Sequence, residues 1–111
     1  MSIKGVNLIK IIEEMRKFDP QLESQAIAVF FTVCLTESAD GVSMQEIAKR
    51  LDLAQSSVSR NVFKLSSVNR HRAIGIGLLE SFEDPMERRR KLVKSTAKGK
   101  RVWSTLCDLV K

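Results

Sequence analysis

Four consecutive cations at residues 88–91, Arg-Arg-Arg-Lys, form the densest group of chemically active side chains in this 111-residue sequence. They follow Glu83-Asp84-Pro85-Met86, whose residue types are typical of turns. Short apolar segments at 78–82 and 91–95 flank this region and predict two strands, which must lean on a larger core to be stable. We therefore expect a β-hairpin that presents a basic tip to an anionic partner. A solvated charged loop and a nuclear-import signal are the alternatives.

A second group of polar side chains lies upstream, on a predicted pair of helices. Ser43-Met44-Gln45-Glu46 is a capping box that predicts a helix over 44–51. A turn at 52–54 follows, and then a helix from Gln55 to about Ser67, anchored by Val58, Val62 and Leu65. The outer face of this helix carries Gln55, Ser56, Ser59, Arg60 and Lys64.

This order of elements is a helix-turn-helix, in which the second helix offers its first residues to the DNA major groove. Gln and Arg suit bidentate contacts with bases, and Ser can bind bases or phosphates. Taken alone, the pattern also fits an ordinary helix hairpin with a polar outer face. A basic hairpin after a helix-turn-helix is the arrangement of a winged helix, and an Arg-bearing loop suits a narrow minor groove.

The distribution of charge supports a polyanionic partner. Residues 1–59 carry six Lys or Arg and eight Asp or Glu, whereas residues 60–101 carry twelve and four. A basic half on a small chain favours nucleic acid. Phosphate neutralisation then supplies much of the affinity and makes binding strongly dependent on salt.

Helices are expected on both sides of these two motifs, which gives a single, mostly α domain with a small β-hairpin over residues 1–111. The first covers 3–17, and the second runs from Pro20 to Glu37 with Asp19 as its N-cap. The last covers 97–110, capped by Thr96. Its apolar stripe, which includes Trp103, predicts either core packing or a dimer seam shared with the first helix, and we favour the seam.

The residues for other functions are scarce. Cys34 and Cys107 lie in apolar helical patterns, where small buried side chains are expected rather than redox sensors. With His71 as the one histidine, we expect no metal site, no cofactor and no enzyme activity. No apolar run approaches the ~20 residues of a membrane span. The N-terminus lacks the pattern of a signal peptide, which predicts a cytoplasmic protein.

The two motifs together resemble the MarR family of bacterial transcription regulators. The matching segments, 43–65 and 77–99, read SMQEIAKRLDLAQSSVSRNVFKL and GLLESFEDPMERRRKLVKSTAKG. The family's wing reads acid-Pro-x-acid-Arg-Arg, a strand, and Leu-Thr-x-x-Gly. The positions that match it are Asp84, Pro85, Glu87, Arg88, Arg89, Thr96 and Gly99. Ser95 replaces the Leu, and Glu87 stands where Asp is more usual.

The resemblance implies a homodimer, joined by its N- and C-terminal helices, that binds a pseudo-palindromic duplex. The leading hypothesis is a sequence-specific regulator that acts as a repressor by blocking access to a promoter. Residues 55–60 match the start of the recognition helix, and Arg89 matches the wing Arg of the minor groove, with Glu87 as its acidic partner. Many relatives release DNA when a small aromatic acid binds, but the sequence does not locate an effector pocket. The candidate DNA-binding residues are Gln55, Ser56, Ser57, Ser59, Arg60, Lys64, Arg70, Arg72, Arg88, Arg89, Arg90 and Lys91.

Two departures separate the chain from the family pattern. It ends at Lys111, where relatives add a long helix, and residues 68–75 form an insertion before the wing. In this insertion Arg70 and Arg72 are expected to contact phosphates, and His71 is expected to be an exposed contact rather than a pH switch. A chain this short suits a compact genome such as that of a phage or plasmid, and the expected location is the cytoplasm, at the bacterial nucleoid. The alternatives to a regulator are a replication or architectural DNA-binding protein and a winged-helix module that binds another protein.

Overall fold

The computed structural model describes residues 3–36, 38–66 and 75–110. Within these ranges the elements follow the order expected for a winged helix. They are α1 (Ile3–Arg16), α2 (Ser24–Thr36), β1 (Val42–Ser43), α3 (Met44–Leu51), α4 (Gln55–Leu65), β2 (Leu79–Glu83), β3 (Lys91–Ser95) and α5 (Ala97–Leu109). The prediction of a mostly helical winged helix-turn-helix is therefore confirmed.

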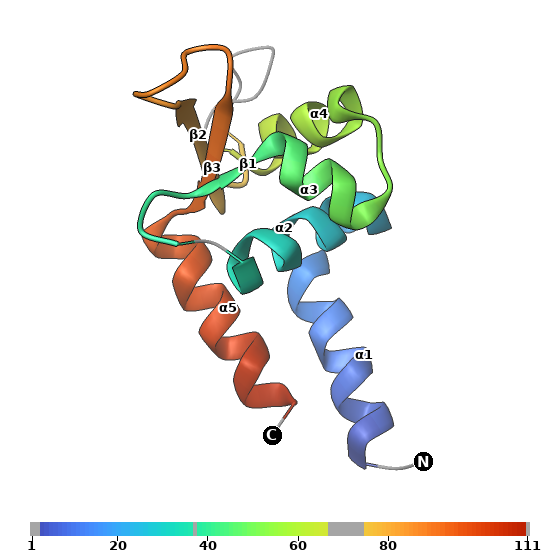
Figure 1. The fold of residues 1–111 in the computed structure, drawn as a ribbon. Coiled ribbons are helices and arrows are strands. Elements are labelled where there is room, and N and C mark those ends of the chain that lie inside the picture. The colour runs from blue at the N-terminus through green and yellow to red at the C-terminus, as the bar shows by residue number, and fades with distance from the viewer. Residues whose placement is uncertain (1–2, 37, 67–74, 111) are drawn as a thin grey trace.

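The elements are arranged so that the molecule has two distinct ends (Figure 1). One end carries α4 and the loop between β2 and β3, and we call it the wing end. The other end carries the outer halves of α1 and α5 with both chain termini, and we call it the terminal end. The helices α1 and α5 contact each other, while α2 lies between them and the helix-turn-helix.

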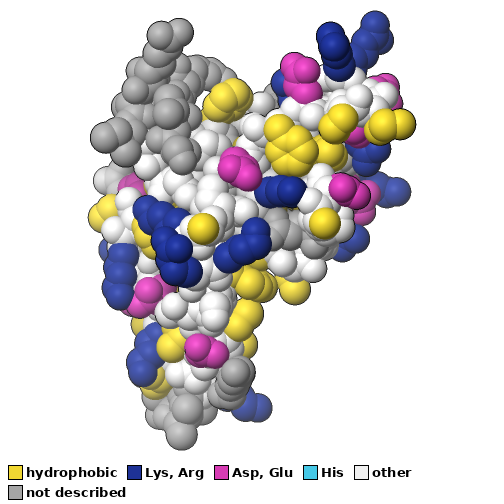
Figure 2. Space-filling model, turned by 90° about the vertical axis from the view of Figure 1, so that its left-hand side faces the viewer, with side chains coloured by type: hydrophobic (Ala, Val, Ile, Leu, Met, Phe, Trp, Pro, Cys, Tyr) yellow, Lys and Arg dark blue, Asp and Glu magenta, His cyan; other side chains and the backbone are white. Residues whose placement is uncertain are grey.

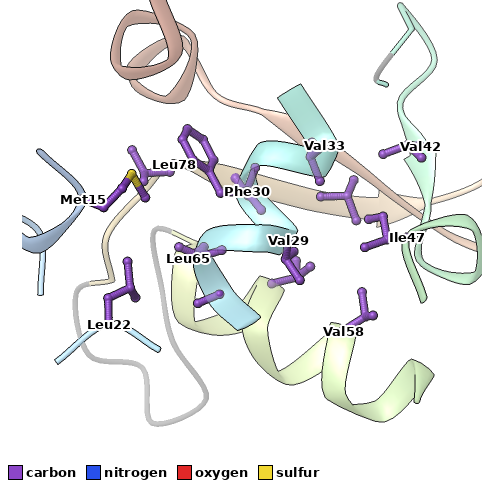
Figure 3. Close-up of a cluster of buried hydrophobic side chains, with 14 of the residues drawn as sticks. Met15, Leu22, Val29, Phe30, Val33, Val42, Ile47, Val58, Leu65 and Leu78 are labelled. Atoms are coloured by element: carbon purple, nitrogen blue, oxygen red, sulfur yellow. The ribbon is translucent and has the colours of Figure 1, made fainter. Parts of the chain in front are cut away.

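The core forms around α2, which contacts α3, α4, α5 and β3. Figure 3 shows Phe30 of α2 among buried side chains from α1, α3, α4 and the segment before β2. Phe30, Met15, Ile47 and Leu78 are all fully buried. Val58, Val62 and Leu65 of α4 are buried as well, which confirms that they anchor this helix.

The wing is a three-stranded antiparallel sheet in the order β1-β3-β2. The predicted hairpin is confirmed, with β2 shifted by one residue, and Phe82 pairs with Leu92. The sequence analysis did not predict β1, which pairs Val42 with Val93. Two residues are too few to show the alternation that identifies a strand in a sequence.

The start of α2 differs from the prediction. The helix begins at Ser24 rather than Pro20, because Asp19 caps a turn instead of a helix. Asp19 Oδ1 accepts a hydrogen bond from the Gln21 amide at 2.9 Å, and the Asp19 carbonyl accepts from the Leu22 amide at 3.0 Å. Asp readily forms such local turns, and this one directs Leu22 into the core.

The end of α4 also falls earlier than expected, at Leu65 rather than about Ser67. The backbone here leaves the helix to pair with the segment that enters the wing. Leu65 O accepts from the Leu78 amide at 2.8 Å, and Ser66 forms a parallel bridge with Leu79. These bonds occupy carbonyl groups at the helix end, where no further helical partner would be available.

A compact junction joins the base of the wing to α5. Thr96 caps α5 as predicted, since its Oγ1 accepts from the Gly99 amide at 3.0 Å. The same hydroxyl donates to the Gly77 carbonyl at 2.6 Å. A side chain at Gly99 would overlap the backbone carbonyl of Leu78, so this position requires glycine. The Thr96–Gly99 junction therefore holds β2 and β3 of the wing on the N-terminus of α5.

The aromatic residue of α5 packs within its own chain. Trp103 lies with its ring centroid 5.5 Å from Phe31 and 6.4 Å from Phe30, the latter in an edge-to-face arrangement. The half-buried indole thus contributes to the contact between α5 and α2, and the dimer seam stays a prediction. None of the helices in the described segments combines the length and apolarity that a bilayer crossing requires.

Candidate nucleic-acid interface

Side-chain hydrogen bonds stabilise α3, and backbone hydrogen bonds fix the turn that joins it to α4. Ser43 Oγ accepts from the Glu46 amide at 3.1 Å, as the capping box predicts, while the Glu46 carboxylate binds Arg50 Nε at 2.9 Å. Asp52 adopts the left-handed conformation (φ 53°) that ends α3, and Leu53 donates to the Ala48 carbonyl at 2.9 Å. Asp tolerates this conformation better than most residues. The turn thus sets the direction of α4 relative to α3.

The first turn of α4 has backbone N–H groups that no side chain caps, and the helix dipole there favours the binding of anions. Ala54 occupies the N-cap, and its methyl side chain has no atom that could accept from the first amides of the helix. Backbone N–H groups at a helix N-terminus attract anions such as phosphate. Gln55 and Ser56, the first two residues of the helix, are both exposed.

The rest of α4 has a buried side and an exposed side. Asn61, which is 2% exposed, donates through Nδ2 to the Ser57 carbonyl at 3.0 Å and to Gln25 Oε1 at 3.3 Å. These bonds tie α4 to α2 and were not anticipated from the sequence. Arg60 is exposed on the opposite side, and Ser57 and Ser59 are half-buried at the flanks.

Lys64 lies apart from the other candidates on α4. Its Nζ is 3.6 Å from the Glu23 carboxylate at the start of α2. It lines a separate hollow that also contains Lys17 and Lys98. The structure therefore does not group Lys64 with the first turns of the helix. Arg70, His71 and Arg72 lie outside the described residues.

The tip of the wing is held in one conformation around Asp84. The Asp84 amide donates to the Arg90 carbonyl at 2.9 Å, and its Oδ1 accepts from the Met86 amide at 2.9 Å. The Glu87 amide donates to the Asp84 carbonyl at 3.2 Å, and the Arg90 amide donates to the Glu87 carbonyl at 3.0 Å. This backbone network fixes the direction in which the four cations leave the chain.

All four cations of the tip are exposed to solvent. Figure 2 views the molecule from the side of the wing, which lies at the upper right with Lys and Arg side chains projecting from its edge. Arg90 is 3.9 Å from the Asp84 carboxylate, and Lys91 is 3.6 Å from the Glu83 carboxylate. Among the described carboxylates none lies within ion-pair distance of Arg89, so the expected pairing with Glu87 is not formed.

The wing and the helix-turn-helix meet in a small polar hollow of about 100 Å³. It is lined by Gln45 and Gln55 on one side and by Glu87, Arg89, Arg90 and Lys91 on the other. We call this group the basic hollow. Gln45 was not among the sequence candidates, although it lies in the first turn of α3 inside the capping box. A polar side chain in the first turn of a helix is the one signal that the sequence offers for Gln45. Its position next to the wing follows only from the fold.

The described residues bring together no group of three His, Cys, Asp or Glu side chains that could hold a metal ion. Cys34 and Cys107 are both half-buried, on α2 and α5. The chemistry concentrated at the wing end is thus that of exposed cations, amides and hydroxyls on a rigid support.

This geometry defines a winged helix-turn-helix, and the sequence agrees. The family of winged helix DNA-binding domains matches residues 24–99, so the chain belongs to that family. The match extends from the start of α2 to the Thr96–Gly99 junction. It includes every candidate DNA-binding residue of the helix-turn-helix and of the wing.

Solved structures share this fold and confirm the MarR-like architecture. A MarR-family transcriptional regulator from Rhodococcus sp. RHA1 is 24% identical, with a TM-score of 0.66 over 96% of this chain and 66% of its own. The MepR–DNA complex of S. aureus is 18% identical, with a TM-score of 0.72 over 95% of this chain and 77% of that one.

The PcaV transcriptional regulator from Streptomyces coelicolor, solved with its natural ligand, is 24% identical. Its TM-score is 0.61 over 81% of this chain and 56% of PcaV. This chain thus spans less than two thirds of the length of PcaV and of the Rhodococcus regulator. No curated protein matches the chain in sequence.

Proposed function

We propose that this protein is a sequence-specific regulator of transcription that binds double-stranded DNA. The basic hollow is the observation that carries this proposal, because one surface joins the first residues of α4 to the cations of the wing. With α4 in the major groove, Gln55 and Arg60 reach base edges, while Ser56 and the helix N-terminus meet phosphates. Arg88 and Arg89 then reach the neighbouring minor groove, where a narrow width strengthens the negative potential.

The active form in this proposal is a homodimer assembled at the terminal end. Leu8, Ile9 and Ile12 of α1 are exposed although they are large and apolar, as is Val110 after α5. Between these helices lies an apolar hollow of about 200 Å³, lined in part by Ile11 and Trp103. Burying such side chains against a second copy is favourable by ~25 cal/mol per Å² of apolar surface. A two-fold dimer would present two α4 helices and two wings to a pseudo-palindromic duplex.

The regulatory effect we propose is repression. A dimer that occupies two successive major grooves and the flanking minor grooves covers about two turns of the duplex. Such coverage excludes other proteins from the same DNA. When the bound sequence overlaps a promoter, RNA polymerase loses access to it.

Selection of bound fragments from a random duplex library, followed by sequencing, tests the proposal. We expect an inverted repeat whose half-sites are centred about 10 base pairs apart. Recovery of DNA without a consensus would contradict sequence-specific regulation and favour an architectural or replication role. Failure to retain any duplex would favour a winged-helix module that binds protein.

A further inference from the structure

One side chain on the exposed side of α4 is apolar, although its neighbours on that side are polar. Phe63 is 45% exposed, and it is the one large hydrophobic side chain of α4 that the structure leaves in solvent to this extent. Arg60 precedes it by one helical turn, and Ser56 precedes it by two. Residues at this spacing share a face of a helix, so the aromatic ring extends a polar stripe.

The position of Phe63 is not explained by packing. The apolar residues that fix α4 to the core are Val58, Val62 and Leu65, all of which are buried on the other side of the helix. Leaving a large apolar ring half in water gives up the stabilisation that full burial would provide. A ring in this position gains that stabilisation when a partner covers the outer face of α4.

We propose that Phe63 contacts the C5-methyl group of a thymine in the major groove and thereby specifies A·T at that position. This inference rests on the proposed function, since it requires α4 to enter the major groove. The thymine methyl is the one apolar group on the major-groove edge, and Phe is among the side chains that recognise it. Cytosine has hydrogen at the same carbon, so the contact discriminates between the two pyrimidines.

The spacing along the helix places this contact next to that of Arg60. Three residues of α-helix advance by about 4.5 Å, which is more than one base-pair step of about 3.4 Å and less than two. Arg60 and Phe63 therefore address nearby base pairs, the first through hydrogen bonds with guanine or phosphate and the second through an apolar contact. Recognition at the Phe63 position would be insensitive to salt, unlike the phosphate contacts.

Removal of single methyl groups from the DNA tests the inference. Starting from the duplex selected by the wild-type protein, each thymine is replaced in turn by uracil, which pairs identically but lacks the methyl. We expect one position in each half-site at which this change weakens wild-type binding by about threefold to tenfold. The Phe63→Ala variant should bind the thymine and uracil duplexes equally well at that position, and Phe63→Leu should keep part of the preference.

Two control variants separate this contact from other effects. Arg60→Ala should bind more weakly but keep the full preference for thymine over uracil. Leu35→Ala removes a side chain of similar character that is 72% exposed at the end of α2, and should change nothing. Circular dichroism of each variant checks that the fold is intact.

The outcomes distinguish this inference from the proposed function. If the wild-type protein selects a consensus but no uracil substitution weakens binding, the thymine contact is wrong and the regulator stands. The same holds if Phe63→Ala and Phe63→Leu retain the full uracil effect. If no duplex sequence is selected, the proposed function itself is overturned, and this inference falls with it.

Discussion

The wing end and the terminal end of this molecule differ in the kinds of side chain that they expose to solvent. At the wing end exposed cations, amides and hydroxyls surround two exposed apolar side chains, Met86 and Phe63. Hydrogen bonds around Asp84 and Thr96 hold the backbone of the wing. At the terminal end, exposed Leu and Ile side chains lie on α1. This contrast supports the two contacts that we propose, with a polyanion at the wing end and with a second copy at the terminal end.

The Thr96–Gly99 junction joins these two ends, and breaking it should have the largest effect. In Gly99→Ala the new methyl group overlaps the Leu78 carbonyl, so the start of α5 or the base of the wing must shift. We expect a loss of about 1–3 kcal/mol in the free energy of unfolding, together with weaker DNA binding. Urea denaturation measures the loss, and Ser104→Ala, on the exposed side of α5, is the matched control. An unchanged free energy of unfolding would mean that the backbone at the junction can shift to accept the methyl group without cost, and that glycine is not required at position 99.

The apolar surface of the terminal end is tested by making it polar. In the double variant Leu8→Gln and Ile12→Gln, two exposed side chains of α1 lose their affinity for a second copy. Each fully buried side chain of this kind contributes about 1.5–3 kcal/mol, so we expect the dimer dissociation constant to rise by at least tenfold. Sedimentation velocity over a range of concentrations gives this constant. The control is Leu35→Gln, and an equally strong dimer in the double variant would place the interface elsewhere.

The basic surface of the wing end is tested through salt. Arg89→Ala should weaken binding to the selected duplex by about tenfold and reduce the slope of log affinity against log salt by about 1. Fluorescence anisotropy at several salt concentrations measures both quantities. Arg101→Ala removes an exposed cation from α5, away from the basic hollow, and should have little effect. If Arg89→Ala leaves the slope unchanged, the wing does not contact phosphates.

The smallest effect is expected at the start of the helix-turn-helix. Ser43→Ala removes the hydroxyl that accepts from the Glu46 amide and should cost about 1 kcal/mol of stability. The affinity of the folded protein for DNA should stay within about twofold, because the Ser43 side chain is buried and does not line the basic hollow. Thermal denaturation and anisotropy provide the two measurements, and Ser81→Ala on the wing serves as the control. A large loss of affinity would show that α3 takes part directly in binding.

The sequence predicted the parts of this fold that depend on local chemistry. The capping box at Ser43, the Thr96 cap and the turn residues of the wing each act within a few positions of the chain, so their signals are visible in the sequence. The order of these signals was enough to identify the winged helix. The resemblance to MarR regulators rested on the same local motifs.

The errors arose where a distant contact overrode a local preference. Asp19-Pro20 is a good helix start, but the turn that carries Leu22 into the core places the start of α2 at Ser24 instead. The packing of Trp103 against Phe30 and Phe31 of α2 was likewise not visible in the pattern of its own helix. Gln45 meets the wing only because the sheet folds back over α3. No spacing within the sequence encodes these three contacts.

The central claim is that the wing and α4 form one DNA-binding surface. Hydroxyl-radical footprinting of the selected duplex, with the wild-type protein and with Arg89→Ala, tests it most directly. Wild-type protein should protect each half-site and the minor groove that flanks it, and Arg89→Ala should lose the flanking protection while keeping the half-sites. Identical footprints for the two proteins would contradict the claim, because the wing would then lie off the DNA.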